Sequence, residues 1–591
     1  MTVSGAPDSV TPPAQPRGRR RAASLALKGA IGLGVLVWVR AFFAGPAALS
    51  GQALGEGPQY RASGVVHVHT SLSDGRGTPA EVIAAGRRAA VDFMVITDHN
   101  RVDPAEFDRV TRPGDPLVIV GSEVSTEAGH ILAIGIRAPT FRFSGTLREA
   151  LDDVRHLGGC AFAAHPTSPR GETRFSREDD PGNFGVEVVN GDTAWREASP
   201  FDLALAAWTY PVNPQFALSR TLDRFESELA LWDRILSRRF APAIGGTDAH
   251  GRIPITRTSS LPLPSYEALF GLVRTVAHLE APLSSNRATA RDQVTRALCA
   301  GSSVVAIPSL ADPSGFSFVA RTGNGEAIGP GSTVRFGPGL ALLAGGAVPK
   351  GTTLRLIESG QTVATATETL KFEPTRPGVF RVEAYAPGAS TPWILANPIS
   401  ILTPEGERAR VEAARPYHEP QVEGSVNIDD FDGTTAFAAE HDPGSSVATP
   451  IVDPEGGRGS GGAALLSFHL NPSPNPPVWC ALVDRTKRDL AASKGISFWL
   501  KGDGEYRVWF QIRDLNPASA DEGTEAWFAS VRTSPAWTLH NISFSSLRSI
   551  NRTSDGSFDP SRIAHLVFVI DHGAMAFGSR GKVWIDDLRA Y

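Results

Sequence analysis

The sequence has very little cysteine: Cys160, Cys299 and Cys480 are three residues among 591. So few thiols exclude a disulfide-built scaffold and a cysteine-rich zinc module. At most one disulfide can form, and we expect three buried thiols instead. An excess of charge of one sign is also lacking, because 57 Lys and Arg face 62 Asp and Glu. The net charge of −5 gives no electrostatic reason to expect a nucleic-acid partner.

A hydrophobic run long enough to span a membrane is missing as well. Apolar residues extend from Gly29 to Val39, whereas a membrane span needs ~20 residues. Arg17 and Arg19–Arg21 precede this run, and the small residues Ala47-Ala48 follow it. That order is typical of an export signal. We predict an exported (periplasmic or extracellular) protein whose signal is cleaved, with an uncleaved N-terminal membrane anchor as the alternative. Membrane contact is expected only through this segment.

Changes in residue pattern divide the rest of the chain. Apolar runs alternate with helical patterns in the first part, which predicts an α/β fold, and short alternating runs between Gly and Pro turns predict β-sandwiches further on. The predicted division is a disordered N-terminus with export signal or anchor at 1–56, an α/β domain at 61–307, a β-sandwich at 308–403, a linker at 404–424 and a β-rich domain at 425–591.

Two segments carry the Thr-x-x-Glu pattern that caps helix N-termini, Thr78-Pro79-Ala80-Glu81 and Thr146-Leu147-Arg148-Glu149. Each predicts the start of a helix, and Gly158-Gly159 predicts the end of the second one. Two further helices are predicted at Tyr266–Leu279 and Ala288–Ala300.

Imidazoles and carboxylates recur at the ends of the apolar runs between residues 61 and 307. His67 and His69 alternate on one predicted strand, so both side chains share a face. In an α/β barrel the C-terminal ends of the strands converge on one face, where active sites lie. The candidate metal ligands are His67, His69, Asp74, His99, Glu123, His130, His165, Asp248 and His250. Asp98 is expected to support a ligand rather than to be one.

Nine ligands are too many for one ion, because a zinc-type site takes three or four. They suit two or three divalent metals, and imidazole with carboxylate favours Mn, Zn or Fe. One metal is expected on His67, His69, Glu123 and Asp248. A second and a third are expected on Asp74, His99, His130, His165 and His250, with Glu123 as a bridge. The residues expected to act in catalysis are His67, His69, His99, Asp248 and His250.

These residues resemble, in their order, the signature of the PHP (polymerase and histidinol phosphatase) family. The matching motifs are His67-x-His69, Ser73-Asp74-Gly75, Thr97-Asp98-His99, Glu123, His130, His165-Pro166 and Asp248-x-His250. The resemblance covers about residues 61–307 and implies a distorted (β/α)7 barrel of the PHP type with two or three metals. The runs 266–279, 381–383 and 393–399 resemble more narrowly the exported carbaryl-hydrolase-like branch, in which an Ig-like β-sandwich follows the barrel.

The resemblance implies a metal-dependent hydrolase in which a metal-bridging hydroxide attacks the substrate. A phosphoesterase acting on a small-molecule ester is our first expectation. A carbamate or carboxylic ester hydrolase on the same centre is the second. A non-catalytic carbohydrate- or envelope-binding protein is the third. Arg101, Arg170 and Asn190 follow strand ends and are candidate substrate contacts.

The last 167 residues hold six of the eleven tryptophans. The segments Ile428-Asp429-Asp430-Phe431, 496–502 and Trp584-Ile585-Asp586-Asp587 resemble a β jelly-roll of the galactose-binding type, found also in family-11 carbohydrate-binding domains. The aromatic side chains could stack on a carbohydrate, although we expect most of them in the core. The resemblance thus makes a carbohydrate the candidate partner of this domain.

Overall fold

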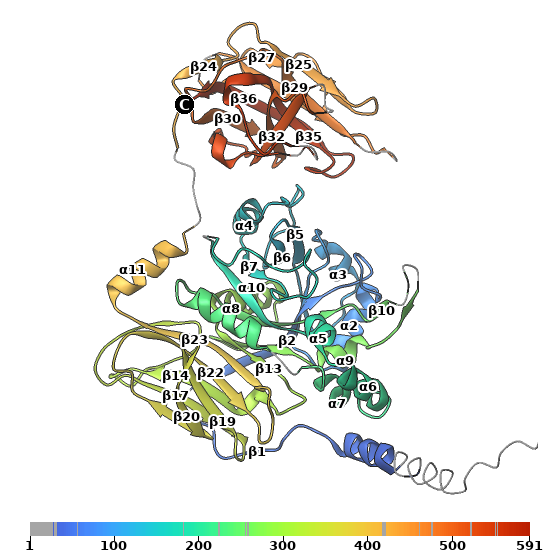
Figure 1. Ribbon diagram of the computed structural model, residues 1–591, viewed down its shortest axis with the longest axis vertical. Coiled ribbons are helices and arrows are strands. Elements are labelled where there is room, and N and C mark those ends of the chain that lie inside the picture. Colours follow the sequence, from blue (N-terminus) through green and yellow to red (C-terminus); the bar gives the residue numbers. More distant parts are fainter. Residues whose placement is uncertain are drawn as a thin grey trace, which may run out of the picture.

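The computed structural model describes residues 28, 32–55, 57–180, 182–222, 225–254, 256, 259–415, 421–459, 461–473, 477–519, 523–549, 551 and 554–591. An α/β part lies at the centre, with one β-sandwich beside it and a second at the far end of the long axis (Figure 1). Most of the N-terminus predicted to be disordered lies outside the described residues. Among the residues described, we find no helix with the length and apolarity to cross a bilayer.

The strands of the α/β part form a mixed sheet. Pairing is parallel from β9 through β2 and β3 to β4 and from β7 through β8 to β9, whereas β6 is antiparallel to both β5 and β7. β5 follows β4 in the sequence after Gly121, but among the strands described β4 pairs only with β3, and β5 pairs only with β6. The strands are β2 (Tyr60–Val68), β3 (Phe93–Ile96), β4 (Leu117–Val120), β5 (Ser122–Thr126), β6 (Gly129–Ile134), β7 (Cys160–Ala163), β8 (Phe184–Asn190), β9 (Ala243–Ala249), β10 (Ile253–Pro254), β11 (Ser260–Leu261), β12 (Arg274–Leu279) and β13 (Ser303–Ala306).

Helices connect several of these strands. They are α2 (Pro79–Arg88), α3 (Pro104–Val110), α4 (Leu147–His156), α5 (Gly191–Glu197), α6 (Pro200–Thr209), α7 (Pro214–Ser219), α8 (Glu226–Leu236), α9 (Tyr266–Phe270) and α10 (Arg287–Ala300). The capping box at Thr78 is confirmed. The second box is wrong: the Thr146 side chain makes no cap bond, and Glu149 instead accepts from Ser144 while Glu127 accepts from the Leu147 N–H.

The helix predicted at Tyr266–Leu279 is also wrong in its second half. The helix α9 ends at Phe270, and the apolar, β-branched residues after Gly271 form β12, which pairs with β2 and β13. Tertiary pairing here overrides the helical pattern of the sequence. The helix predicted at Ala288–Ala300 is confirmed, starting one residue earlier at Arg287.

The expectation of three free thiols is wrong as well. Cys160 on β7 and Cys299 on α10 form a disulfide, with Cα atoms 5.7 Å apart. The two residues are 139 positions apart in the sequence, so only the packing of α10 against the sheet brings them together. Cys480 is the free, buried thiol among the described residues.

The first β-sandwich continues the sheet of the α/β part, because β13 pairs with β23. One of its sheets has the order β20-β19-β22-β23, with β16 on β23, and the other has the order β15-β14-β17-β21. The strands are β14 (Phe316–Arg321), β15 (Ala327–Ile328), β16 (Thr333–Arg335), β17 (Ala341–Gly346), β18 (Val348–Pro349), β19 (Thr353–Glu358), β20 (Gln361–Thr367), β21 (Thr369–Phe372), β22 (Gly378–Tyr385) and β23 (Ile394–Leu402).

Two buried side chains of this sandwich reach into the α/β part. Arg381 on β22 donates to both carboxylate oxygens of Asp233 on α8, each at 2.7 Å. The amide of Asn397 on β23 donates to the Ala243 carbonyl at 2.9 Å and accepts from the Ala243 N–H at 2.7 Å. Ala243 begins β9, so the sandwich supports the start of a central strand. The predicted linker 404–424 contains a helix, α11 (Pro404–Ala413).

The second β-sandwich packs two sheets, β26-β28-β36-β30-β33 with β24 and β27, and β25-β29-β35-β31-β32-β34. Phe498, Phe510 and Phe568 fill the space between them. The strands are β24 (Val426–Asp429), β25 (Phe437–His441), β26 (Ser446–Ala448), β27 (Val452–Asp453), β28 (Ala463–His469), β29 (Trp479–Asp484), β30 (Gly495–Gly502), β31 (Arg507–Leu515), β32 (Thr524–Arg532), β33 (Thr538–Ser543), β34 (Arg548–Ser549), β35 (Ile563–Asp571) and β36 (Arg580–Ala590).

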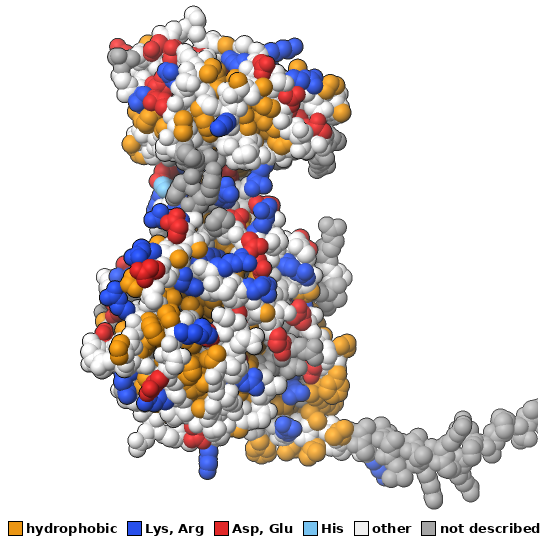
Figure 2. Space-filling view, turned by 60° about the vertical axis from the view of Figure 1, so that its left-hand side comes forward, with side chains coloured by type: hydrophobic (Ala, Val, Ile, Leu, Met, Phe, Trp, Pro, Cys, Tyr) orange, Lys and Arg blue, Asp and Glu red, His pale blue; other side chains and the backbone are white. Residues whose placement is uncertain are grey.

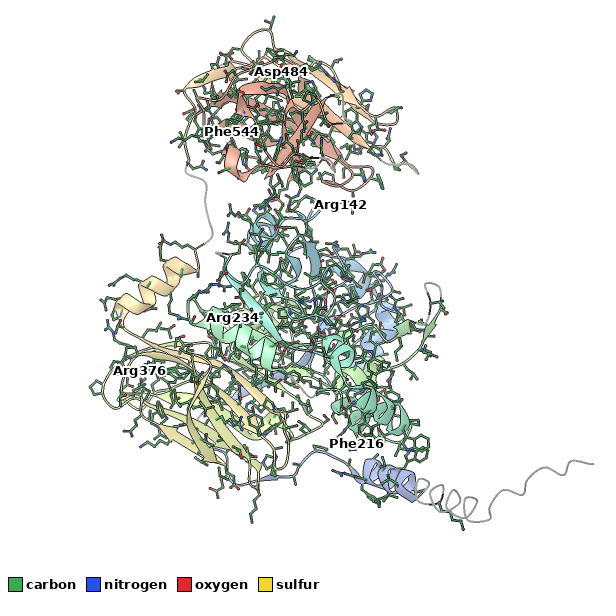
Figure 3. The ribbon with its side chains drawn as sticks, viewed as in Figure 1. Arg142, Phe216, Arg234, Arg376, Asp484 and Phe544 are labelled. Carbon is green, nitrogen blue, oxygen red and sulfur yellow. A yellow bond between two sulfur atoms is a disulfide. The ribbon has the colours of Figure 1, made fainter. Side chains whose placement is uncertain are left out.

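Charged side chains join this sandwich to the α/β part at a narrow neck (Figure 2). The Asp153 carboxylate on α4 is fully buried and pairs with Arg507 and Arg532 of the sandwich. Arg142 lies at the same junction (Figure 3): its carbonyl accepts from Arg507 at 2.8 Å and its N–H donates to the Ala574 carbonyl at 2.9 Å. The junction is therefore held by specific hydrogen bonds and buried ion pairs.

Replacing Arg507 by Met should destabilise the chain by about 3 kcal/mol, because the buried Asp153 carboxylate would lose one of its two arginine partners. The matched control is Arg137→Met, which removes an exposed pair with Glu505 and should cost about 0–1 kcal/mol. Urea denaturation followed by tryptophan fluorescence measures both. Equal effects of the two variants would contradict a structural role for the buried pair.

Candidate metal centre

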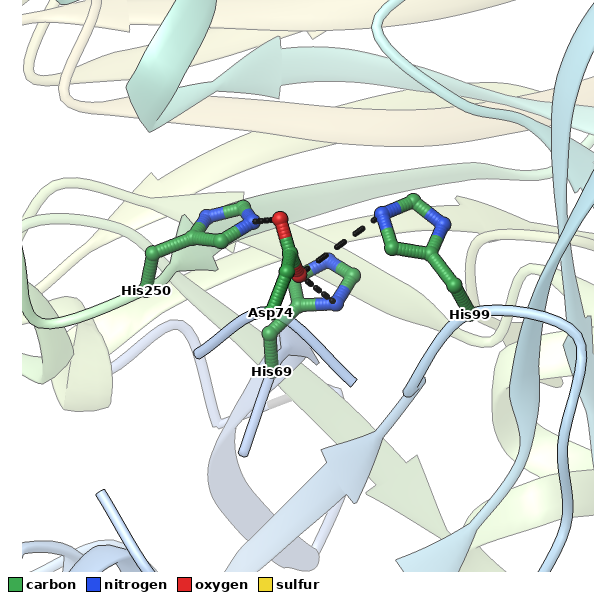
Figure 4. A group of neighbouring side chains, drawn as sticks. All are labelled: His69, Asp74, His99 and His250. Atoms are coloured by element: carbon green, nitrogen blue, oxygen red, sulfur yellow. Dashed lines mark ion pairs between the residues drawn. The ribbon is translucent and has the colours of Figure 1, made fainter. Parts of the chain in front are cut away.

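The structure brings all nine candidate ligands together at one end of the α/β strands. His67 lies in β2, one residue before its end, and His69 follows the strand. Glu123 lies on β5, and Asp248 lies on β9 with His250 just beyond it. Four overlapping sets have donor atoms within 4.8 Å of one another. The sets are His69, Asp74, His99 and His250 (Figure 4); His67, His69 and Glu123; His67, His165 and Asp248; and His99, Glu123 and His130.

Glu123 lies between these sets and is 1% exposed. Its Oε2 is 3.2 Å from His67 Nε2 and 3.1 Å from His69 Nε2. Its Oε1 is 2.6 Å from His130 Nδ1 and 2.8 Å from His165 Nε2. One carboxylate thus faces imidazoles from several strands with both of its oxygens.

Two further carboxylates complete the cluster from opposite sides. Asp248 Oδ1 is 3.4 Å from Nε2 of both His67 and His69. Asp74 Oδ2 is 3.1 Å from His250 Nε2, and Asp74 Oδ1 is 3.7 Å from His99 Nε2 (Figure 4). Asp74 is the most exposed member, followed by His99 and His250, so the cluster opens to solvent on their side.

The donor set fits divalent metal ions. Within the described residues, neither ring nitrogen of His69 makes a hydrogen bond although both are buried, and the same holds for Nδ1 of His165. A buried polar atom without a partner needs an explanation, and a metal ion supplies one. Imidazole nitrogens mixed with carboxylate oxygens are ligands suited to Zn, Mn and Fe.

Proton affinities in the cluster reflect its excess of negative charge. Burial lowers the pKa of His67, but Asp248, Glu187 and Glu123 more than offset this and raise it well above its ordinary value. Burial also lowers the pKa of His69, but Asp248 and Glu123 more than offset this and raise it to about 10. The pKa of Glu123 is held well below its usual range by its histidines, despite its burial. Metal ions that bind here must displace these protons, so their affinity rises with pH.

Glu187 on β8 supports the cluster, and the sequence analysis did not select it. Its Oε1 is 2.8 Å from His67 Nδ1, and its Oε2 accepts from the His165 N–H at 2.6 Å. The carboxylate therefore directs Nε2 of His67 toward Glu123. A glutamate inside the fully buried run Phe184–Asn190 was the signal that could have revealed it.

Asp98 supports the loop that bears Asp74 rather than a histidine. Its oxygens accept from the Thr70 N–H and hydroxyl at 2.7 Å each and from the Ser73 hydroxyl at 2.6 Å. The backbone of the site is also strained, since His67 and Asp248 have φ of 63° and 49°. Non-glycine residues adopt such angles at a cost, and they cluster at functional sites.

A cavity of about 350 Å3 opens above the cluster. Arg170, Arg196 and Arg252 line it, together with Asp192 and Trp195. Of the candidate substrate contacts, only Arg170 lines this cavity.

The other two candidates have different contacts. Arg101 turns away, donating to the Leu72 carbonyl at 2.8 Å and to Asp103. Asn190 is buried and donates to Glu187 at 3.0 Å and to Asp248 at 3.4 Å. Arg252, two residues after His250, was recognisable from the sequence by its position alone.

Comparison with known proteins gives one family match. Residues 415–579 match the family model described as carbohydrate binding domain (family 11). An uncharacterized protein of Methanocaldococcus jannaschii is 26% identical over 137 residues, which are 21% of this chain and 80% of that protein.

Among solved structures, the family 11 carbohydrate-binding module of Clostridium thermocellum, in complex with a β-1,3-1,4-mixed-linked tetrasaccharide, is 21% identical. The match covers 29% of this chain and 96% of that one, with a TM-score of 0.24. A two-domain protein of Bacteroides vulgatus, described as containing a predicted PHP-like metal-dependent phosphoesterase, is 15% identical. It covers 60% of this chain and 98% of that one, with a TM-score of 0.28.

Replacing Glu187 by Gln should weaken metal binding ten- to a hundredfold, because the His67 ring loses the carboxylate that orients it. Titration of Mn2+ or Zn2+ into the metal-stripped chain by calorimetry measures the effect. Glu228→Gln is the matched control, since that buried carboxylate accepts from Thr167 instead. Unchanged affinity in Glu187→Gln would contradict the orienting role.

Proposed function

We propose that the chain is an exported, metal-dependent phosphoesterase whose residues 61–307 form a distorted (β/α)7 barrel of the PHP type. The observation that carries the proposal is the convergence of nine imidazoles and carboxylates beneath a cavity lined by three arginines. The resemblance of the nine residues to the PHP signature adds to it. We assign all nine as ligands of two or three divalent ions.

The arginines favour a phosphate ester over a neutral ester. Arg170 and Arg196 share one carboxylate, Asp192, at 3.6 Å and 2.5 Å. Arg252 lies 3.6 Å from Asp74, which also faces the histidines. Two guanidinium groups on one carboxylate leave N–H donors and positive charge for an anionic substrate. A carbamate or a carboxylic ester carries no negative charge with which these arginines could form an ion pair.

We assign different roles in the reaction to different residues of the chain. Bound divalent ions lower the pKa of a water molecule to ~7 and neutralise charge that develops on the substrate. Glu187 holds the proton on Nδ1 of His67 and so keeps Nε2 of that ring free for the cluster. The Asn190 amide donates to both Asp248 and Glu187 and so fixes the positions of their carboxylates relative to each other. Asp74 and His99 face the open side, where a substrate oxygen can enter.

Export is supported by two independent features. The disulfide between Cys160 and Cys299 is typical of oxidising compartments. A carbohydrate-binding module suits a protein that meets polysaccharide outside the cytoplasm.

The proposal predicts metal-dependent release of phosphate. The full chain, stripped and reloaded with Mn or Zn, is assayed on phosphate mono- and diesters beside aryl esters and carbamates. His165→Ala should lose activity about a hundredfold or more, because a ligand is removed. Arg252→Ala should raise KM about tenfold or more for the phosphate substrate, since a charge-assisted hydrogen bond is worth ~1.5–3 kcal/mol.

Arg101→Ala is the matched control for Arg252→Ala, because its guanidinium contacts Leu72 and Asp103 outside the cavity. Cleavage of esters or carbamates alone would replace the phosphoesterase by the second candidate. Absence of turnover with metals bound would favour a binding protein.

We also propose that the second sandwich binds a carbohydrate chain, with the family match as its main support. Trp479, Trp509 and Phe528 lie half-buried on the outer face of the sheet that contains β29, β31 and β32. Trp509 donates to Asp571 at 2.9 Å, which fixes its ring. The expectation that most tryptophans are core residues is wrong, because of the six only Trp527 is buried.

The double variant Trp479→Ala/Trp509→Ala should weaken binding of a mixed-linked β-glucan tetrasaccharide about tenfold, since each aromatic contact is worth ~0.5–1.5 kcal/mol. Calorimetry on the full chain measures it. Trp537→Ala is the control, because that ring packs against Lys501 on the other sheet. Equal losses in both variants would argue against this face.

A further inference from the structure

We propose that the N-terminal helix and α6 form one apolar face that docks on an anionic lipid bilayer, and that the N-terminal segment is retained for this purpose. The helix spans residues 32–43 of the described chain. The face comprises Leu33, Val35, Leu36, Trp38, Val39, Phe42, Phe43, Phe201 and Trp208. This inference does not depend on the proposed phosphoesterase activity.

The side chains of this face are exposed to an extent that needs a partner. Phe43 is 79% exposed, Phe201 73% and Trp208 54%. Figure 2 shows hydrophobic side chains gathered at the end of the molecule from which the N-terminal segment departs. A large contiguous apolar patch on a water-facing surface marks a contact with a protein or a membrane.

The N-terminal helix is built into the fold at this place. Trp38 donates through its indole N–H to the Trp208 carbonyl at 3.1 Å, and the two rings lie 5.5 Å apart. The Asn213 amide donates to the carbonyls of Ala41 and Ala44, each at 3.0 Å. Ala41 is fully buried. The helix therefore packs on α6 and α7 through specific hydrogen bonds.

The segment after the helix is also part of the fold. The Ala47 N–H donates to the Leu310 carbonyl at 2.8 Å, and β1 (Leu49–Ser50) pairs with β18. These are the small residues that read as a signal-cleavage site. Cleavage there would remove the helix and leave the Asn213 amide without its partners, the carbonyls of Ala41 and Ala44. The geometry thus favours the retained segment over the cleaved signal.

Charge and residue type identify the occupant as a lipid surface. Between residues 9 and 55 the sequence has no acidic residue but six cations: Arg17, Arg19, Arg20, Arg21, Lys28 and Arg40. Basic residues beside an exposed apolar helix attract anionic headgroups. Tryptophan rings with one polar edge, such as Trp38 and Trp208, are typical of the membrane interface. In a dimer formed through this face, the positively charged segments of the two copies would repel each other.

The apolar face and the cavity of the metal centre are formed in part by the same stretch of chain, α5 to α7. Trp195 and Arg196 of α5 and Leu218 of α7 line the cavity, and α6 connects these helices. Docking through α6 therefore holds that wall of the cavity close to the bilayer.

The test is co-sedimentation of the full chain with vesicles of phosphatidylcholine alone or with 30% phosphatidylglycerol (roughly the anionic fraction that gives a strong surface potential). We expect binding to the anionic vesicles, weakened at least tenfold in Phe201→Ser/Trp208→Ser and unchanged in Val411→Ser, whose side chain is 57% exposed on α11. Mass spectrometry of the exported protein should find the N-terminal helix intact.

Other outcomes overturn the proposal. Cleavage before residue 51 would show that the helix is not retained. Vesicle binding unaffected by the α6 variant would assign the membrane contact to an inserted N-terminal segment alone. Loss of a dimer in the α6 variant, measured by light scattering, together with no vesicle binding by the parent chain, would assign the face to a second copy.

Discussion

The buried carboxylate of Glu123 is the constraint on which the α/β part depends. An ionised carboxylate that is 1% exposed is tolerated only where compensating groups surround it. Five imidazoles do so, and they come from the ends of β2, β3, β6 and β7. The strand ends must therefore converge within hydrogen-bond distance of one point. The left-handed backbone at His67 and Asp248 turns these side chains toward that point. Glu187, a second buried carboxylate, fixes the ring of His67.

Much of this arrangement could be predicted because short stretches of sequence determine it. A histidine or a carboxylate at the end of an apolar run identifies both a strand and the face where it ends, and most of the nine candidate residues follow from that pattern, whereas Asp74 lies in a loop. Contacts that depend on packing could not be predicted. Cys160 and Cys299 meet only through α10, and the residues after Gly271 form a strand because β2 and β13 are there to pair with them. Arg101 and Arg252 have similar sequence surroundings, but only Arg252 reaches the cavity.

The two β-sandwiches are attached by different kinds of interaction. The first shares a sheet with the α/β part through β13 and β23, and its Asn397 supports the start of β9, which carries Asp248. The second meets the α/β part mainly through side chains, with Arg507 and Arg532 around Asp153, and its chain connection runs through α11. The first sandwich thus belongs to the scaffold of the metal centre, whereas the second is held against it.

The shared sheet has a consequence for how such a gene can change. A recombination event at residue 307 would cut between β13 and the strand that covers its edge, and it would leave β9 without the amide of Asn397. A crossover within 404–424 would separate only the second sandwich, and its cost would be limited to the contacts of the junction, including those of Asp153, Arg142 and Arg137. We therefore expect the second sandwich to be exchanged between lineages more readily than the first, which is inherited together with the α/β part.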